Sequence, residues 1–218
     1  DMIASGPVSP DSSTCADALA VAEKYALRLS DTARGLLAQE TPKTADNVTV
    51  RVTGSVRELC AAAAKACRDL GYTPEILTDC EQGVAREVGA RLGALARENA
   101  SCGTPRAFIL GGETVVRLTG NGKGGRNQEL ALAAAAEIAG AENVVVFSVG
   151  SDGTDGPTDA AGGLVTGEFA ARCREKGLSI AKTLADNDAY NLLRQTDGLI
   201  VTGPTGTNVC DLTMLLVK

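Results

Sequence analysis

A glycine-rich segment with two cations offers the clearest site for chemistry in the sequence. Residues 120–129 read GNGKGGRNQE. Glycine lets the backbone approach a ligand and turn successive amides into one concavity, and a helix that begins here would add the positive end of its dipole. The segment therefore predicts a phosphate or carboxylate site built from Gly122, Lys123, Gly124, Gly125, Arg126 and Asn127. The alternative is a flexible loop with solvated charges.

A second loop concentrates carboxylates. Residues 151–163 read SDGTDGPTDAAGG and follow an apolar stretch at 144–149. Open α/β sheets place ligands at such strand ends. Asp152 and Asp155 could hold Mg²⁺, which takes one or two carboxylates besides water and phosphate oxygens, or could bind substrate hydroxyls or act as a base. The alternative is a series of Asx turns, in which Asp side chains bond their own backbone.

A third loop, TGPTGTN at 202–208, offers hydroxyls and amides to an anion through Thr205, Gly206, Thr207 and Asn208. A tight β-turn is its alternative. Asn187 and Asp188 are more typical of a helix cap than of a site.

Composition excludes several classes of site. Histidine is absent, so no imidazole base, Ser-His-Asp triad or HExxH zinc site exists in this chain. The net charge is −6 and aromatic residues make up 3%, which argues against nucleic acid as a partner. Seven cysteines without a CxxC pair indicate free, mostly buried thiols in a reducing cytoplasm. No apolar run approaches the ~18 residues that cross a bilayer, so we expect no membrane partner.

Periodicity predicts an α/β protein. In the first half we expect helices at 12–26 (opened by Asp11 or Ser12), 31–39 (capped by Ser30), 56–70 and 84–98, and strands at 48–52 and 72–78. This alternation predicts βαβ units on a mostly parallel sheet.

The composition becomes loop-like at 100–105, where we place a domain boundary. Beyond it we expect a hairpin of 107–110 with 114–118, helices at 127–139, 168–176, 179–185 and 188–195, and strands at 144–149, 164–166, 198–202 and 211–217. The strand at 144–149 is so apolar that it should lie centrally in its sheet.

Five motifs in this order resemble one family. GGET (111–114), GKGGRNQEL (122–130), SDGTDGPTDAAGG (151–163), NDAY (187–190) and TGPTGTNVCDL (202–212) look like the C-terminal MOFRL domain of class II glycerate 2-kinases, whose members are often labelled hydroxypyruvate reductase. Residues 3–7 and the ~95 that follow resemble the end of that family's N-terminal domain. The resemblance thus spans nearly the whole chain.

The resemblance implies a fold and a reaction. The fold is three-layer α/β/α, with a mixed sheet in a MOFRL-type domain at 101–218 and part of a Rossmann-like domain at 1–100. The reaction is transfer of the ATP γ-phosphoryl group to D-glycerate, with ATP and Mg²⁺ as cofactors, in the cytoplasm, and with a homodimer left open. Matching motifs assign catalysis to Arg126, Asp152 and Asp155, metal to the same two aspartates, and substrate or phosphate binding to Glu113, the 122–127 loop and Thr205–Asn208.

Two departures and two rival functions accompany this assignment. Lys123 stands where the family often has arginine, which keeps the charge but loses the bidentate fork. Family members are about twice as long, with a catalytic lysine in the part that would precede Asp1, so we expect little kinase activity from residues 1–218 alone.

The rival functions are an NAD(P)H-dependent hydroxypyruvate reductase and a non-catalytic ligand-binding module. The GxGxxG match at Gly120, Gly122 and Gly125 supports the reductase only weakly.

Overall fold

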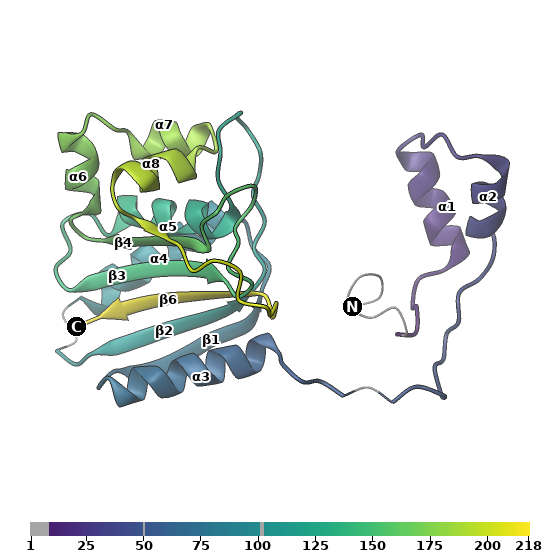
Figure 1. Cartoon of the computed structure of the whole chain (residues 1–218), viewed down its shortest axis with the longest axis horizontal. Coiled ribbons are helices and arrows are strands. Elements are labelled where there is room, and N and C mark those ends of the chain that lie inside the picture. The colour runs from purple at the N-terminus through teal and green to yellow at the C-terminus, as the bar shows by residue number, and fades with distance from the viewer. Residues whose placement is uncertain (1–8, 50, 101–102) are drawn as a thin grey trace. The chain divides into compact units, whose positions relative to one another are not determined.

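The computed structural model describes residues 9–49, 51–100 and 103–218 (Figure 1). These residues form two compact units, one ending at Val52 and one beginning at Thr53. Residues 3–7, which enter the family resemblance, and part of the expected boundary at 100–105 lie outside the described residues. Because one unit runs through residue 100, the boundary expected there does not separate compact units, and its place between family domains stays a prediction.

The first unit holds two short helices, α1 (Cys15–Lys24) and α2 (Asp31–Leu37). Thr14 caps α1 in a capping box with Asp17, so the expected start at Asp11 or Ser12 was too early. Ser30 caps α2 as predicted.

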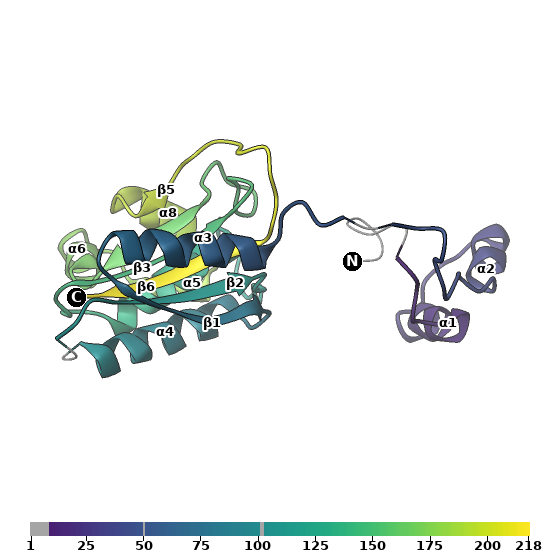
Figure 2. The same cartoon turned by 90° about the horizontal axis from the view of Figure 1, so that it is seen from below.

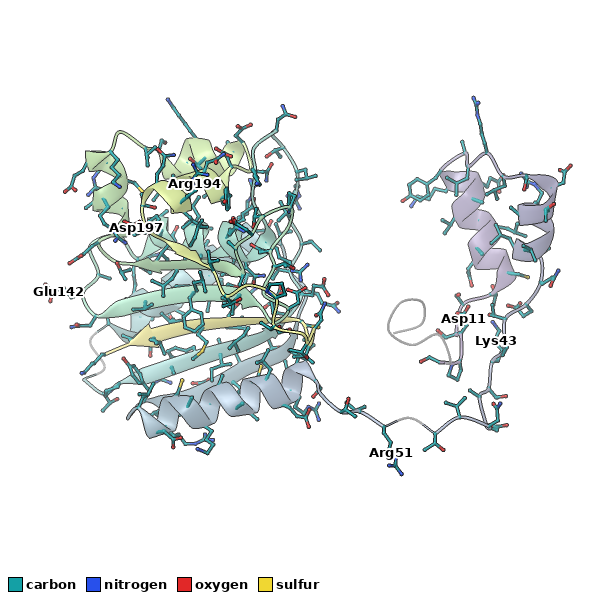
Figure 3. All side chains as sticks on the ribbon, viewed as in Figure 1. Asp11, Lys43, Arg51, Glu142, Arg194 and Asp197 are labelled. Carbon is teal, nitrogen blue, oxygen red and sulfur yellow. The ribbon has the colours of Figure 1, made fainter. Side chains whose placement is uncertain are left out.

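This unit buries little apolar surface. Ala22 is the one buried hydrophobic residue among its described positions, whereas Tyr25 is 63% and Leu36 62% exposed. Polar contacts join the segments that flank the helices. The Thr41 hydroxyl donates to Asp11 and accepts from the ammonium of Lys43 (Asp11 and Lys43 are labelled in Figure 3). The expected strand at 48–52 is wrong for the described residues, which lie in irregular, mostly exposed chain; Val50 lies outside them.

The second unit is built on a six-stranded sheet of order β1-β2-β6-β3-β4-β5. The strands are β1 (Thr73–Glu81), β2 (Arg106–Gly112), β3 (Val144–Gly150), β4 (Gly162–Thr166), β5 (Leu199–Ile200) and β6 (Asp211–Val217). The sheet is mixed, as predicted, and β3 lies inside it. Among the described strands, only β1 and β2 pair in parallel, and helix α4 (Ala85–Asn99) lies between them in the chain as in the predicted βαβ unit. The other four strand pairs are antiparallel, so the expectation of a mostly parallel sheet was wrong.

Helices cover both faces of this sheet. Helix α3 (Val56–Asp69), capped by Ser55, lies on one face, and α4 with α5 (Arg126–Glu137) lies on the other (Figure 2). Side chains of β2 alternate accordingly: Ala107 and Ile109 pack with α3, whereas Phe108 and Leu110 pack in the larger core of α4 and α5. Each fully buried leucine of that core contributes about 2 kcal/mol. The predicted three-layer α/β/α architecture is confirmed.

The chain does not form a hairpin after β2. The segment expected as its second strand instead follows the end of β1: Glu113 donates its amide to the Glu81 carbonyl, and Val115 donates to Gly83. Gly112 adopts a φ of 150°, and a Cβ there would lie 2.3 Å from the Glu81 oxygen. Gly112 thus permits close approach to β1, and Gly111 permits close packing against Val56 and Cys60 of α3, so the two glycines do not form a hairpin turn.

The remaining helices flank α5 near the predicted places. They are α6 (Phe169–Glu175), α7 (Ile180–Ala185) and α8 (Ala189–Gln195). No helix in the described part of the chain is long and apolar enough to span a bilayer. Of the six described cysteines, Cys60, Cys67 and Cys173 are buried and all are free; Cys102 lies outside the described residues.

Candidate functional site

The site forms at one edge of the sheet, where β2 and β3 end and β6 begins. In the register of the sheet, Asp211 of β6 lies between Gly112, the last residue of β2, and Gly150, the last residue of β3. Both neighbours are glycines, and a Cβ on Gly112 would lie 2.3 Å from the Glu81 oxygen and one on Gly150 2.5 Å from the Thr154 oxygen. Helix α5 begins at this edge with Arg126.

Arg126 is held by two carboxylates. Its Nε and Nη2 donate to the two oxygens of Asp211 at 2.6 and 2.9 Å, a bidentate pair. Its Nη1 lies 2.9 Å from Oε1 of Glu113. The hydrogen bonds to Asp211 raise the pKa of Arg126 above its usual value, so this cation is permanent.

Asp211 is a residue that the site prediction lacked. It belongs to the quoted TGTNVCDL motif, but its partner Arg126 lies 85 positions earlier in the chain. A buried carboxylate at the first position of a strand is the signal that could have drawn attention to it, because buried carboxylates are almost always paired.

Asp155 caps the helix that Arg126 begins. Its Oδ1 accepts the amide of Asn127 at 3.1 Å, and its Oδ2 accepts the amide of Gln128 at 2.8 Å. Asn127 also donates its side-chain Nδ2 to the same carboxylate. A carboxylate here offsets the positive end of the helix dipole.

Burial sets the chemistry of Asp155. The side chain lies in a residue that is 3% exposed, and this desolvation raises its pKa to about 6, against the lowering effect of the Gln128 and Asn127 donors. Both oxygens already accept hydrogen bonds, so this geometry favours a structural role over metal binding. Its predicted catalytic and metal-binding roles stay untested.

Asp152 forms the turn that its alternative interpretation predicts. Its Oδ1 accepts the amide of Thr154 at 2.9 Å, as in an Asx turn. The carbonyl of Asp152 accepts the amide of Thr205, and the Ser151 hydroxyl accepts the amide of Val209, so the aspartate loop and the 202–208 loop are joined. No group of three acidic, cysteine or histidine residues in the described ranges is placed to hold a metal ion.

The glycines of the 120–125 segment face the protein itself. A Cβ on Gly120 would lie 2.3 Å from Asp186, on Gly122 2.4 Å from Asp188, and on Gly125 2.2 Å from the Asp155 carboxyl carbon. The sequence predicts these glycines as a route for close approach to a ligand. In the structure, these three glycines are required because other segments of the same chain lie too close to leave space for a side chain.

Asn187 fixes the start of this segment and caps no helix. Its Oδ1 accepts the amides of Thr119 and Gly120 at 2.7 and 3.0 Å. Its Nδ2 donates to Glu129, which is 2% exposed and paired with Arg86 at 3.0 Å. The expectation of a capping role for Asn187 was wrong. Asp188 does precede α8, but its carboxylate accepts the amide of Lys123 rather than an amide of that helix's first turn.

Three amides of the segment differ from the others in their hydrogen bonding. The amides of Gly120, Asn121, Gly122, Lys123, Asn127 and Gln128 all donate to acceptors of the protein. Within the described ranges, those of Gly124, Gly125 and Arg126 have no such acceptor. They line a cleft of about 840 Å³ together with Glu113 and an apolar wall that includes Val115, Val116, Leu118 and Pro157. This arrangement suits an anion with an apolar part.

Lys123 does not share the environment of Arg126. Its ammonium lies 4.6 Å from the centre of the Tyr190 ring, and the Tyr190 hydroxyl donates to Asp159 at 2.7 Å. This hydrogen bond lowers the pKa of Asp159. The two cations that the sequence groups together therefore have different partners.

The family models match two parts of the chain. The model described as "MOFRL family" matches residues 106–211, and the one described as "Domain of unknown function (DUF4147)" matches residues 1–38.

Individual relatives match the whole chain. A D-glycerate 2-kinase of Thermotoga maritima is 46% identical over 224 residues, covering 100% of this chain and 53% of the relative. A glycerate kinase of Macaca fascicularis is 33% identical, with 100% of this chain and 69% of the relative covered. The crystal structure of a glycerate kinase from Thermotoga maritima superimposes with a TM-score of 0.88 at 45% identity, over 100% of this chain and 54% of that one. The chain therefore spans about half the length of the first of these relatives.

Proposed function

Because the chain belongs to the glycerate 2-kinase family that contains the MOFRL domain, we propose that the whole protein transfers the γ-phosphoryl group of ATP to D-glycerate, giving 2-phosphoglycerate. The residues described above would supply its anion-binding part. The observation that carries this proposal is the set of three unpartnered amides at the start of α5, beside the fixed guanidinium of Arg126.

This arrangement suits phosphoryl transfer, which depends mainly on positioning and on neutralising charge. The amides of Gly124, Gly125 and Arg126 would hold phosphate oxygens at the positive end of a 12-residue helix. The Arg126 side chain would add a full charge from the floor of the cleft. Lys123, at the edge of the same segment, would attract the polyanion without a fixed geometry.

The other predicted residues take supporting roles in this proposal. Thr205, Gly206, Thr207 and Asn208 would bind the carboxylate of D-glycerate or a phosphate, and their loop is tied to the aspartate loop through Asp152. Asp155 would keep the first turn of α5 in place. Asp152 remains the candidate to accept the proton of the glycerate hydroxyl or to bind metal through water.

The two proposed cofactors, ATP and Mg²⁺, differ in how far the described residues support them. ATP would place its phosphates at the amides and its base against the apolar wall of the cleft. Mg²⁺, when bound with ATP, would neutralise phosphate oxygens. The described residues do not offer it a complete ligand set of their own.

The reductase rival loses its sequence support in this geometry. The GxGxxG glycines pack against Asp186, Asp188 and Asp155, so contact within the protein accounts for their lack of a side chain without any dinucleotide. The segment also follows irregular chain, whereas the dinucleotide fingerprint follows a strand directly.

A coupled assay tests the proposal. Full-length protein is given D-glycerate and ATP, and 2-phosphoglycerate is detected through enolase. We expect ATP-dependent product, and much less from residues 1–218 alone. Oxidation of NADH with hydroxypyruvate, without any ATP-dependent product, would support the reductase instead. Binding without turnover in the full-length protein would support a non-catalytic module.

A further inference from the structure

Arg126 has two carboxylate partners that differ in burial and geometry. The Asp211 side chain is 6% exposed and contacts the guanidinium through two parallel hydrogen bonds. The Glu113 side chain is 59% exposed and contacts one nitrogen, Nη1. Glu113 and Arg126 line the cleft, whereas Asp211 does not.

The backbone fixes Asp211 firmly. It is the first residue of β6 and is paired with glycines on both sides. Cys210, just before it, has a φ of 68°, a conformation that is unfavourable for a non-glycine residue and persists only where its surroundings impose it. The carboxylate thus has a set direction, and its bidentate pair sets the plane of the guanidinium.

Glu113 occupies the side of the guanidinium that faces the cleft. An exposed ion pair of this kind contributes little, because water competes for both partners. An anion held by the amides of Gly124 and Gly125 would have to take over Nη1 from Glu113. A dianion that also gains these amides has the advantage over a single exposed carboxylate.

We infer that Asp211 is a positioning residue for the proposed phosphoryl transfer, and that Glu113 is a displaceable occupant of the anion position. Asp211 holds Nε and Nη2 of Arg126 so that Nη1 is directed to the cleft. Glu113 covers Nη1 until an anionic ligand replaces it. This inference rests on the proposed function, because it assumes that the ligand is an anion bound by Arg126.

Two variants with the same charge change separate positioning from simple electrostatics. Asp211→Asn and Glu113→Gln each remove one negative charge next to the same guanidinium. If charge alone mattered, both would bind inorganic phosphate more tightly. We expect Glu113→Gln to bind it about three- to tenfold more tightly, because its competitor is gone. We expect Asp211→Asn to bind it at least threefold more weakly, because Arg126 loses its orientation.

Titration of the 218-residue chain with inorganic phosphate, followed by ¹H–¹⁵N spectra, gives these affinities. Glu75→Gln is the matched control, since Glu75 pairs with Arg106 at the other end of the sheet. It should bind phosphate as the unaltered chain does. Equal tightening in Asp211→Asn and Glu113→Gln would overturn the inference while leaving the anion site intact. Absence of phosphate binding by the unaltered chain would instead overturn the proposed anion site itself.

A second measurement does not depend on the stability of Asp211→Asn. The Nε–H signal of Arg126 in the unaltered chain should exchange slowly with water and stay unchanged in Glu113→Gln. A rapidly exchanging Nε–H would contradict the bidentate pair.

In the full-length enzyme, Asp211→Asn should lower kcat about 100-fold with a smaller change in KM, and Glu113→Gln should lower KM. A change in KM alone for Asp211→Asn would contradict a positioning role.

Discussion

Two glycine-rich loops at the same edge of the sheet have similar composition and different physical organisation. In the 120–128 loop, glycines lie against Asp186, Asp188 and Asp155, and a side chain would collide with each. In the 202–208 loop, a Cβ on Gly203 or Gly206 would meet nothing within 4 Å, and both have a positive φ. In the first loop, glycine is required because other segments of the protein leave no space for a side chain. In the second loop, glycine is required because the turn needs a positive φ.

This difference separates a preorganised site from an adaptable one. The first loop is fixed by hydrogen bonds at both ends, so its three available amides have set directions. The second is exposed and is held mainly through Thr205, whose amide donates to Asp152 and whose hydroxyl donates to the Ser151 carbonyl. Preorganised donors stabilise developing charge more effectively than donors that must first be ordered. On this ground our proposal places phosphate at the first loop and the glycerate carboxylate at the second.

The largest expected effect belongs to Arg126→Ala. Removing the cation from the preorganised site should lower kcat/KM of the full-length enzyme by about 10²–10³-fold, the scale seen when a transition-state donor is lost. The enolase-coupled assay measures it. Arg97→Ala is the matched control, because Arg97 pairs with Glu137 at the opposite end of α4 and α5. An Arg126→Ala enzyme as active as that control would refute the assignment.

The pH dependence of Asp155 gives the next largest effect. Its pKa is raised from 3.8 to about 6, so the folded protein keeps this proton where the unfolded chain has lost it. The protonated Asp155 therefore adds to the free energy of unfolding. This addition is complete below about pH 4 and is lost as the pH rises through 6. About two pKa units correspond to a loss on the order of 3 kcal/mol. Urea unfolding at several pH values, compared with Asp155→Asn, should show it.

Asp159 provides a control of opposite sign for this experiment. Its pKa is lowered by the Tyr190 hydroxyl, so its contribution is present at neutral pH and is lost as the pH falls. The difference in the free energy of unfolding between the unaltered chain and Asp159→Asn should therefore become smaller as the pH falls. A pH profile of Asp155→Asn that runs parallel to that of the unaltered chain would contradict the buried carboxylate.

Alanine substitutions in the two loops sharpen their comparison directly. Gly125→Ala places a Cβ against Asp155 and should cost about 2 kcal/mol, which lowers Tm by roughly 4–8 °C in a chain of this size. Gly206→Ala has free space and should cost only about 1 kcal/mol for its φ of 79°. Calorimetry on both variants checks the order. A larger loss in Gly206→Ala would reverse the comparison.

The sequence predicts local features of this chain well. Helix α5 after the glycines, the apolar strand β3 and the cap at Ser30 follow from short-range pattern, and each is confirmed. The pairing of Arg126 with Asp211 could not be foreseen, because it depends on β6 lying between β2 and β3. The false hairpin after β2 has a similar cause. Two glycines between apolar runs are typical of a turn, but here contact with β1 determines the path.

The same limit applies to the predicted role of the glycines. Composition alone shows that the backbone of 120–125 can be approached closely, and it does not show by what. The approaching groups are Asp186, Asp188 and Asp155, which lie 30 or more residues away along the chain. Tertiary contacts thus leave only the amides of Gly124, Gly125 and Arg126 without a protein acceptor among the described residues of the segment that the sequence predicts to bind an anion.

A titration of the 218-residue chain with inorganic phosphate tests the central claim most directly. With assigned ¹H–¹⁵N spectra, we expect the largest shifts at the amides of Gly124, Gly125 and Arg126, and small ones at Gly122 and Lys123, whose amides already donate to the protein. Largest shifts at Gly206–Asn208, with none at the start of α5, would contradict the claim that the preorganised loop is the phosphate site.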